Sequence, residues 1–152
     1  MPRPRPLSQE EMEDLLRSAS HGHFGCAFRD RVYVVPMSFG YDGKHLYVFT
    51  HSGKKTEYMR RNPWVCLTVD EVAGPECWRS VVVDGTVEFL EQPDDRALAA
   101  RVILDHQGVV GGEPAALIER WAGPDGDAGL FLRVHVREIT GLGENWPPQP
   151  RA

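Results

Sequence analysis

Alternation of apolar and polar side chains with a period of two recurs along the chain, and it constrains the fold more than any other feature of the sequence. Such runs are typical of β-strands, and turn residues such as Asp42-Gly43 separate them as in hairpins. With helices inserted between the runs, the pattern predicts a mainly β fold, a small antiparallel barrel. The predicted strands are His23–Phe28, Val32–Phe39, His45–Thr50, Trp64–Asp70, Cys77–Glu91 and Leu130–Ile139.

Three features inside these runs predict local details of the sheet. Pro36 cannot donate a ladder hydrogen bond, so its strand is expected at an edge or beside a bulge. Gly85 predicts a bulge or a close approach of another backbone. Both sets of alternating positions in Trp64–Asp70 include apolar residues, so we expect this strand to be buried on both faces.

Helices are predicted at three places outside the cationic turn described next. Ser8 and Glu11 have the spacing of a capping box and precede apolar residues at helical spacing. Pro93 begins a second helix, with acidic residues in its first turn as the helix dipole prefers. A third, shorter helix is expected over Glu113–Trp121.

The stretch Phe49–Pro63 combines a strand end, a tight turn and a short helix whose first turn is cationic. Ser52 is placed to cap this helix, and Lys54 and Lys55 follow at the end where unpaired N–H groups are already positive. An anion bound by the helix end, the Ser52 hydroxyl and the lysines would offset this repulsion, as in phosphate sites. The alternative is that both lysines are simply solvated.

Length and composition limit the domain organisation. With 152 residues, of which 41% are hydrophobic, the chain fits a single domain over residues 1–152 with one buried core. The ends at residues 1–6 and 143–152 are rich in Pro and are expected to be irregular tails.

Charge and motif content argue against several classes of protein. A net charge of −5 argues against a general nucleic-acid surface, and no apolar run is long enough to cross a membrane or to form a signal peptide, so a cytoplasmic location is expected. The three widely spaced cysteines favour buried thiols in a reducing compartment. His21 and His23 share a strand face but lack a nearby third ligand, so no metal site is predicted.

Three segments together resemble the flavin-binding split-barrel superfamily, which includes pyridoxamine 5′-phosphate oxidases and nitroimidazole-resistance proteins. The segments are Val35–Tyr41, Phe49–Pro63 and Trp78–Gly85. The resemblance implies a split antiparallel β-barrel that forms a homodimer and holds FMN at the subunit boundary. The C-terminal Trp and Arg that complete the oxidase sites have no counterpart here, which argues against a pyridoxamine phosphate oxidase itself. The nitroimidazole-resistance branch is the better match, because it shares the Val35-Pro36 strand, a His near the phosphate-binding turn and the Arg60–Pro63 ending.

The resemblance also implies roles for individual residues. Lys55, with Lys54 beside it, is implied to meet the FMN phosphate, and His51 is the candidate proton donor, although it is equally interpreted as a surface neighbour of the helix start. The cofactor set predicted from the turn and the resemblance together is Pro36, Met37, Ser38, Phe39, Phe49, Thr50, Ser52, Lys54, Lys55, Arg79 and Ser80.

The function implied by the resemblance is that of an FMN-dependent oxidoreductase. It would take electrons from an external donor such as NAD(P)H and pass them to a small acceptor such as a nitroaromatic or a quinone. Two alternatives stay open at this point. The same barrel is also compatible with haem or a deazaflavin coenzyme, and with a flavin-binding or sensing module that does not catalyse a reaction.

Overall fold

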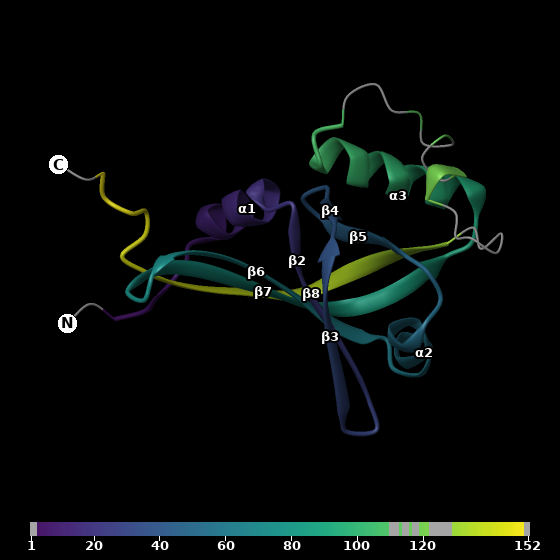
Figure 1. Ribbon diagram of the computed structural model, residues 1–152, viewed down its shortest axis with the longest axis horizontal. Helices are drawn as coiled ribbons and strands as arrows, with labels where there is room; N and C mark the ends of the chain where they lie inside the picture. The colour runs from purple at the N-terminus through teal and green to yellow at the C-terminus, as the bar shows by residue number, and fades with distance from the viewer. Residues whose placement is uncertain (1–2, 110–112, 114–115, 117–118, 122–128, 151–152) are drawn as a thin grey trace.

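The computed structural model describes residues 3–109, 113, 116, 119–121 and 129–150, and its eight strands form one antiparallel sheet (Figure 1). The strand order is β3-β2-β6-β7-β8-β5-β4, and β1 pairs with β8 beside this path. The elements are β1 (Arg5–Pro6), α1 (Gln9–Ser18), β2 (His21–Phe28), β3 (Arg31–Ser38), β4 (Gly40–Tyr41), β5 (His45–Thr50), α2 (Lys54–Arg61), β6 (Trp64–Gly74), β7 (Cys77–Leu90), α3 (Pro93–His106) and β8 (Leu130–Glu144).

The two edges of the sheet are joined through a single residue. Strand β3 ends at Ser38 and β4 begins at Gly40, so Phe39 alone connects one edge of the sheet to the other. From this junction β3 and β5 run apart, which leaves the barrel open along one side (Figure 1). The split barrel is therefore confirmed, and Pro36 lies in an edge strand as predicted.

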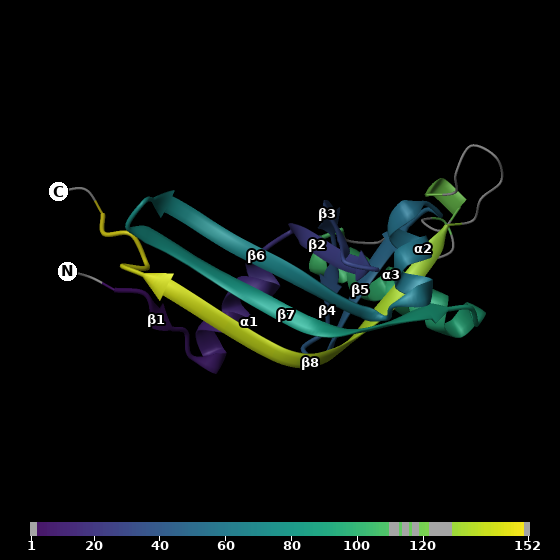
Figure 2. The same cartoon turned by 90° about the horizontal axis from the view of Figure 1, so that it is seen from below.

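The core fills the concave side of the curled sheet. Along β6, Val65, Leu67 and Val69 are buried, whereas the alternating Cys66 and Thr68 are half-exposed. The prediction that this strand is buried on both faces is wrong, because only one face of β6 packs against the core. A second buried cluster lies where α3 packs on β5 and β8, and it includes Tyr47, Ile103 and Phe131. Figure 2 shows β6, β7 and β8 side by side as a long curved layer.

The predicted irregularity at Gly85 is confirmed. The pairing of β7 with β8 shifts register between Asp84 and Gly85. A Cβ atom at Gly85 would lie 2.4 Å from the carbonyl oxygen of His135, so only glycine allows the two backbones to approach this closely.

Helix α1 begins with the predicted capping box. The Glu11 N–H donates to the Ser8 hydroxyl over 3.1 Å, and the Ser8 N–H donates to the Glu11 carboxylate over 3.1 Å. Leu15 and Leu16 are fully buried, so the apolar stripe of this helix packs against the sheet as its spacing predicts.

Helix α3 packs unusually close to β4. A Cβ atom at Gly40 would lie 2.7 Å from Cα and 2.8 Å from N of Ile103, so a side chain at this position would collide with the helix backbone. The Gln107 amide then donates to the carbonyl oxygens of Ser20, over 2.7 Å, and Phe39, over 2.8 Å. These contacts fix the end of α3 above the opening between β3 and β5. The predicted helix over 113–121 lies largely outside the described residues.

Both chain ends are more regular than expected. Arg5 pairs with Gly143 and Pro6 with Leu142, and β8 continues to Glu144 against the start of β7. The irregular tails predicted for residues 1–6 and 143–152 are therefore corrected where they overlap these strands. The last residues of β8 lack the alternation of apolar and polar side chains from which strands were predicted. They still form a strand, because the backbone hydrogen bonds to β7 do not depend on the side chains. In the described part of the chain, no helix has the length and apolar character needed to span a bilayer.

Candidate functional site

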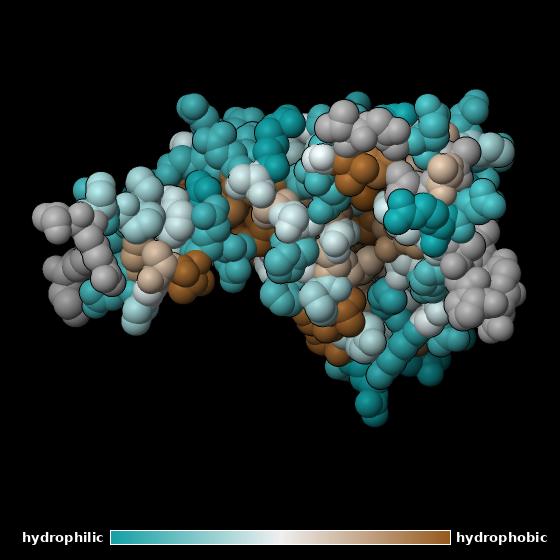
Figure 3. Space-filling model, turned by 45° about the horizontal axis from the view of Figure 1, so that its top comes forward, coloured by the Kyte–Doolittle hydropathy of each residue, from teal (hydrophilic) through white to brown (hydrophobic). Residues whose placement is uncertain are grey.

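A cavity of about 770 Å³ occupies the opening where β3 and β5 diverge. Helix α3 and residues 120–121 cover it from one side, and the start of α2 closes one end. The space-filling view shows a hollow in this region with apolar side chains in its floor (Figure 3). Its lining residues are Val35, Pro36, Met37, Ser38, Phe49, Thr50, His51, Lys55, Ile103, Gln107, Arg120 and Trp121.

Most of the residues predicted from the sequence meet at this cavity. They come from two strands that the chain connects through Phe39, and from the turn that follows β5. The predicted residues in the lining are Pro36, Met37, Ser38, Phe49, Thr50, His51 and Lys55. Whether they touch a cofactor stays a prediction.

The start of α2 presents a cationic and uncapped helix end to the cavity. Ser52 is exposed and does not cap the helix, which corrects the prediction. Gly53 is the N-cap residue, and the Thr56 hydroxyl accepts from its N–H over 2.8 Å and donates to its carbonyl oxygen over 2.9 Å. Because glycine offers no side-chain cap, the first N–H groups of α2 are left for another acceptor.

The two lysines of this turn have different surroundings. Lys55 is half-buried, lines the cavity and forms no ion pair with a described residue. The Lys54 ammonium group instead lies 5.3 Å from the ring centroid of Tyr33 and 5.9 Å from that of Tyr58. Cation–π attraction therefore stabilises the Lys54 ammonium group beside these rings, while Lys55 is the cation that lines the cavity.

Strand β3 contributes backbone as well as side chains to the cavity wall. As the edge strand it pairs with β2 on one side, so half of its N–H and C=O groups point away from the sheet. Pro36 is placed in the middle of this wall. A flat ligand lying along Val35–Ser38 would find carbonyl and N–H groups at its edge.

An aromatic cluster forms the opposite wall. The Phe49 ring lies 5.0 Å from Trp121, 4.9 Å from Phe131 and 5.3 Å from His51, centroid to centroid. Gly129 has a φ of +75°, and a Cβ atom there would lie 2.2 Å from the Phe49 ring, so glycine is required for this packing. The exposed His51 is thereby held at the rim of the cavity with its ring edge-on to Phe49.

Three other predicted site residues, Phe39, Arg79 and Ser80, do not line the cavity. Phe39 is fully buried and packs 4.7 Å from the His106 ring, so it serves the core. Arg79 and Ser80 lie near the start of β7, in grooves separate from the cavity. Arg79 pairs with Glu71 over 2.5 Å and stacks on Trp146 at 5.2 Å.

The electrostatic character of the cavity differs from that of the chain as a whole. The chain carries a net charge of −5, yet the described lining contains Lys55 and Arg120 and no carboxylate. Together with the free helix end, these cations make the cavity suited to an anionic ligand. Its apolar and aromatic walls favour a planar one.

Sequence reasoning missed four residues of the side that faces β3. Ile103 and Gln107 reach the cavity because α3 packs against Gly40, and Trp121 because its ring packs on Phe49. Arg120 accompanies Trp121. Helical spacing identifies the apolar stripe of α3 but does not tell which element the stripe covers.

Two histidines outside the predicted site have partners in the structure. His106 accepts from the Tyr41 N–H over 3.2 Å, and its other ring nitrogen lies 2.7 Å from the carbonyl oxygen of Ala19. His135 contacts Glu88 over 3.0 Å and lowers the pKa of that carboxyl. Both lie outside the cavity lining, and no group of three or more potential metal ligands is found among the described residues.

Burial keeps the Cys26 thiol, which lies beside the start of α2, in its protonated form. The Cys26 thiol donates to the Lys55 carbonyl oxygen over 3.7 Å, and burial raises its pKa. All three cysteines are free. A protonated, buried thiol is a poor nucleophile, so Cys26 supports the turn by packing.

Comparisons of the sequence and of the structure with known proteins point to the same family. Residues 8–142 match the family profile described as pyridoxamine 5′-phosphate oxidase. The structure is similar to that of an FAD-binding protein from Mesorhizobium loti, with a TM-score of 0.71 and 33% identity, over 93% of this chain and 97% of that chain. It also matches a putative 5-nitroimidazole antibiotic resistance protein from Bacteroides thetaiotaomicron, with a TM-score of 0.73 and 23% identity, over 93% and 88% of the two chains.

A match to an uncharacterized protein from Rhizobium meliloti is more limited in extent. The two sequences are 35% identical over 86 residues, and this chain spans just over half of that protein, because the match covers 57% of each.

Proposed function

Because the chain belongs to the pyridoxamine 5′-phosphate oxidase family, we propose that it is a flavin-dependent oxidoreductase whose cavity at the opening of the barrel binds the cofactor. The observation that carries this proposal is Lys55, a half-buried cation without an ion-pair partner among the described residues, beside an uncapped helix end. These are the groups that bind a phosphate.

The residues present fit a flavin mononucleotide unit. Lys55 and the first N–H groups of α2 would hold the phosphate, and the wall over Val35–Ser38 offers backbone groups to the edge of a flat ring. The cavity of about 770 Å³ lies within the usual range for small-molecule sites, roughly 300–1,000 Å³. We propose FMN as the cofactor, and FAD, which the Mesorhizobium loti protein is described as binding, contains the same unit.

When bound, the flavin would supply electron transfer between a reduced nicotinamide and a small acceptor such as a nitroaromatic or a quinone. The chain itself positions and protects the reacting groups. We propose that Phe49 and Trp121 exclude water from one wall, and that His51 at the rim donates a proton to the acceptor as it is reduced.

We further propose that two copies of the chain associate. Val32, Val34 and Trp64 are 74%, 57% and 55% exposed and line one shallow groove on the outer face of the sheet. Large apolar side chains gathered in this way favour a protein interface. Arg79 and Ser80, which were predicted to bind the cofactor, lie apart from the cavity of their own chain. In a dimer they could instead contact the cofactor bound by the partner subunit. Light scattering of the purified protein would show twice the mass of one chain.

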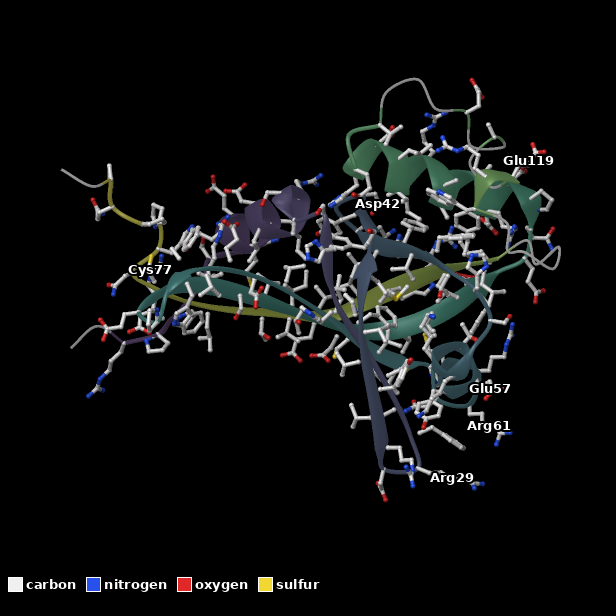
Figure 4. The ribbon with its side chains drawn as sticks, in the orientation of Figure 1. Arg29, Asp42, Glu57, Arg61, Cys77 and Glu119 are labelled. Atoms are coloured by element: carbon white, nitrogen blue, oxygen red, sulfur yellow. The ribbon has the colours of Figure 1, made fainter. Side chains whose placement is uncertain are left out.

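The test is the absorption spectrum and the flavin affinity of the purified protein, compared with those of Lys55→Gln. Loss of a charge-assisted hydrogen bond of about 1.5–3 kcal/mol predicts a Kd for FMN roughly 10- to 100-fold higher. Arg61→Gln removes a cation from the same helix. The Arg61 guanidinium lies 5.3 Å from the centroid of the Phe28 ring, outside the cavity lining, so this change should leave the Kd unchanged (Figure 4).

Three results would contradict the proposal. They are a wild-type protein that binds neither FMN nor FAD, a haem or deazaflavin spectrum, and equal affinities of the two variants. Bound flavin that neither NAD(P)H nor candidate acceptors can cycle would instead favour a binding or sensing module.

A further inference from the structure

The cavity lining contains a second cation, Arg120, besides Lys55. Arg120 lines the side opposite to β3, whereas Lys55 comes from the start of α2. The Arg120 guanidinium forms no ion pair or hydrogen bond within the described structure. Its neighbour Glu119 lies at the outer edge of the molecule and is not part of the lining (Figure 4).

The position of Arg120 is set by its other neighbour. The Trp121 ring packs 5.0 Å from Phe49 and 6.5 Å from Phe131, which attaches this turn to β5 and β8. Because Trp121 is packed in this way, the backbone of the adjacent Arg120 is held in place and its side chain can reach only a limited part of the cavity. Its planar group carries donors arranged to bind both oxygens of a carboxylate or a phosphate.

We infer that Arg120 binds the anionic group of a second ligand, a small planar aromatic acceptor that carries a carboxylate. This inference rests on the proposed function, since it assigns the flavin phosphate to Lys55 and leaves Arg120 for the acceptor. The aromatic pair Phe49 and Trp121 provides a surface for the ring of such a molecule. The described lining contains no carboxylate that would repel a negative ligand.

The site should therefore discriminate by charge. A carboxylate gains the bidentate contact with Arg120, whereas a neutral analogue of the same shape leaves the guanidinium solvated. Because Arg120 is exposed and water screens its charge, we expect 4-nitrobenzoate to bind more tightly than 4-nitrobenzamide by roughly 2- to 5-fold, and the difference to shrink as salt is added.

The test is a calorimetric titration of both nitro compounds into the wild-type protein and into Arg120→Gln, with and without FMN. The substitution should abolish the preference for 4-nitrobenzoate, leave the Kd of 4-nitrobenzamide unchanged, and weaken the binding of FMN much less than Lys55→Gln does. Arg101→Gln is the matched control, because Arg101 lies on α3 outside the lining and loses the same charge. Arg120→Lys should retain part of the preference.

The outcomes separate the two proposals. Equal binding of the two nitro compounds to the wild-type protein, or an unchanged preference in Arg120→Gln, would overturn the role of Arg120. If Arg120→Gln weakens the binding of FAD but not of FMN, Arg120 binds the second phosphate of FAD, and its role in binding the acceptor is overturned. If the protein binds no flavin but still prefers 4-nitrobenzoate through Arg120, the anion site stands and the flavin proposal fails.

Discussion

The close approach of α3 to β4 offers the sharpest test of how the cavity is built. In Gly40→Ala the new Cβ atom would start 2.7–2.9 Å from the backbone of Val102 and Ile103. Ordinary contacts begin near 3.4 Å, so the helix has to retreat by several tenths of an ångström. Overpacking of this kind costs about 1–3 kcal/mol, and weakening the two Gln107 hydrogen bonds adds about 1 kcal/mol.

The assay is urea unfolding followed by fluorescence. A loss of roughly 2–4 kcal/mol, with an m-value of about 2 kcal/mol/M, lowers the midpoint by about 1–2 M. Because Ile103 and Gln107 line the cavity, FMN affinity should fall as well. Gly74→Ala is the control, since a Cβ atom there meets no atom within 4 Å. Equal midpoints for the two variants would refute the claim that α3 rests on the Gly40 backbone.

Two further predictions concern the attachment of α1. Arg5 and the Ser8 N–H lower the pKa of Glu11 to about 2. This carboxylate therefore contributes stability that is present above its unfolded pKa, about 4.3, and is lost as the pH falls toward 2. Urea midpoints of the wild type and Glu11→Gln should differ at pH 7 and converge at pH 2, and a constant difference would contradict this. Tyr41 donates to Glu13 over 2.5 Å, so Tyr41→Phe should lower the free energy of unfolding by about 1 kcal/mol, whereas an unchanged midpoint would show that water replaces this bond without cost.

Much of the fold follows from local patterns in the sequence. Period-two alternation located the six long strands, and the capping box located α1, because both depend on near neighbours in the chain. The ends of β1 and β8 were missed because their pairing is a long-range event that leaves little trace in side-chain pattern.

The candidate site was only partly visible in the sequence. The unusual charge at Lys54-Lys55 identified the turn, but the direction of each side chain depends on Tyr33 and Tyr58, which lie in different elements. Ser52 has the right chemistry for a cap, yet the helix begins one residue later. The side formed by α3 and residues 120–121 depends on how a helix packs over the sheet, which no motif encodes.

The exposed edge at β3 also bears on how the protein avoids aggregation. An unpaired edge strand is a template on which another extended chain can add, and a ligand site built on such an edge cannot be protected by permanent pairing. Pro36 removes one donor in the middle of β3, so a foreign strand cannot bond along its full length. The same residue thus leaves the edge accessible to a small flat molecule and makes it a poor partner for amyloid-like stacking.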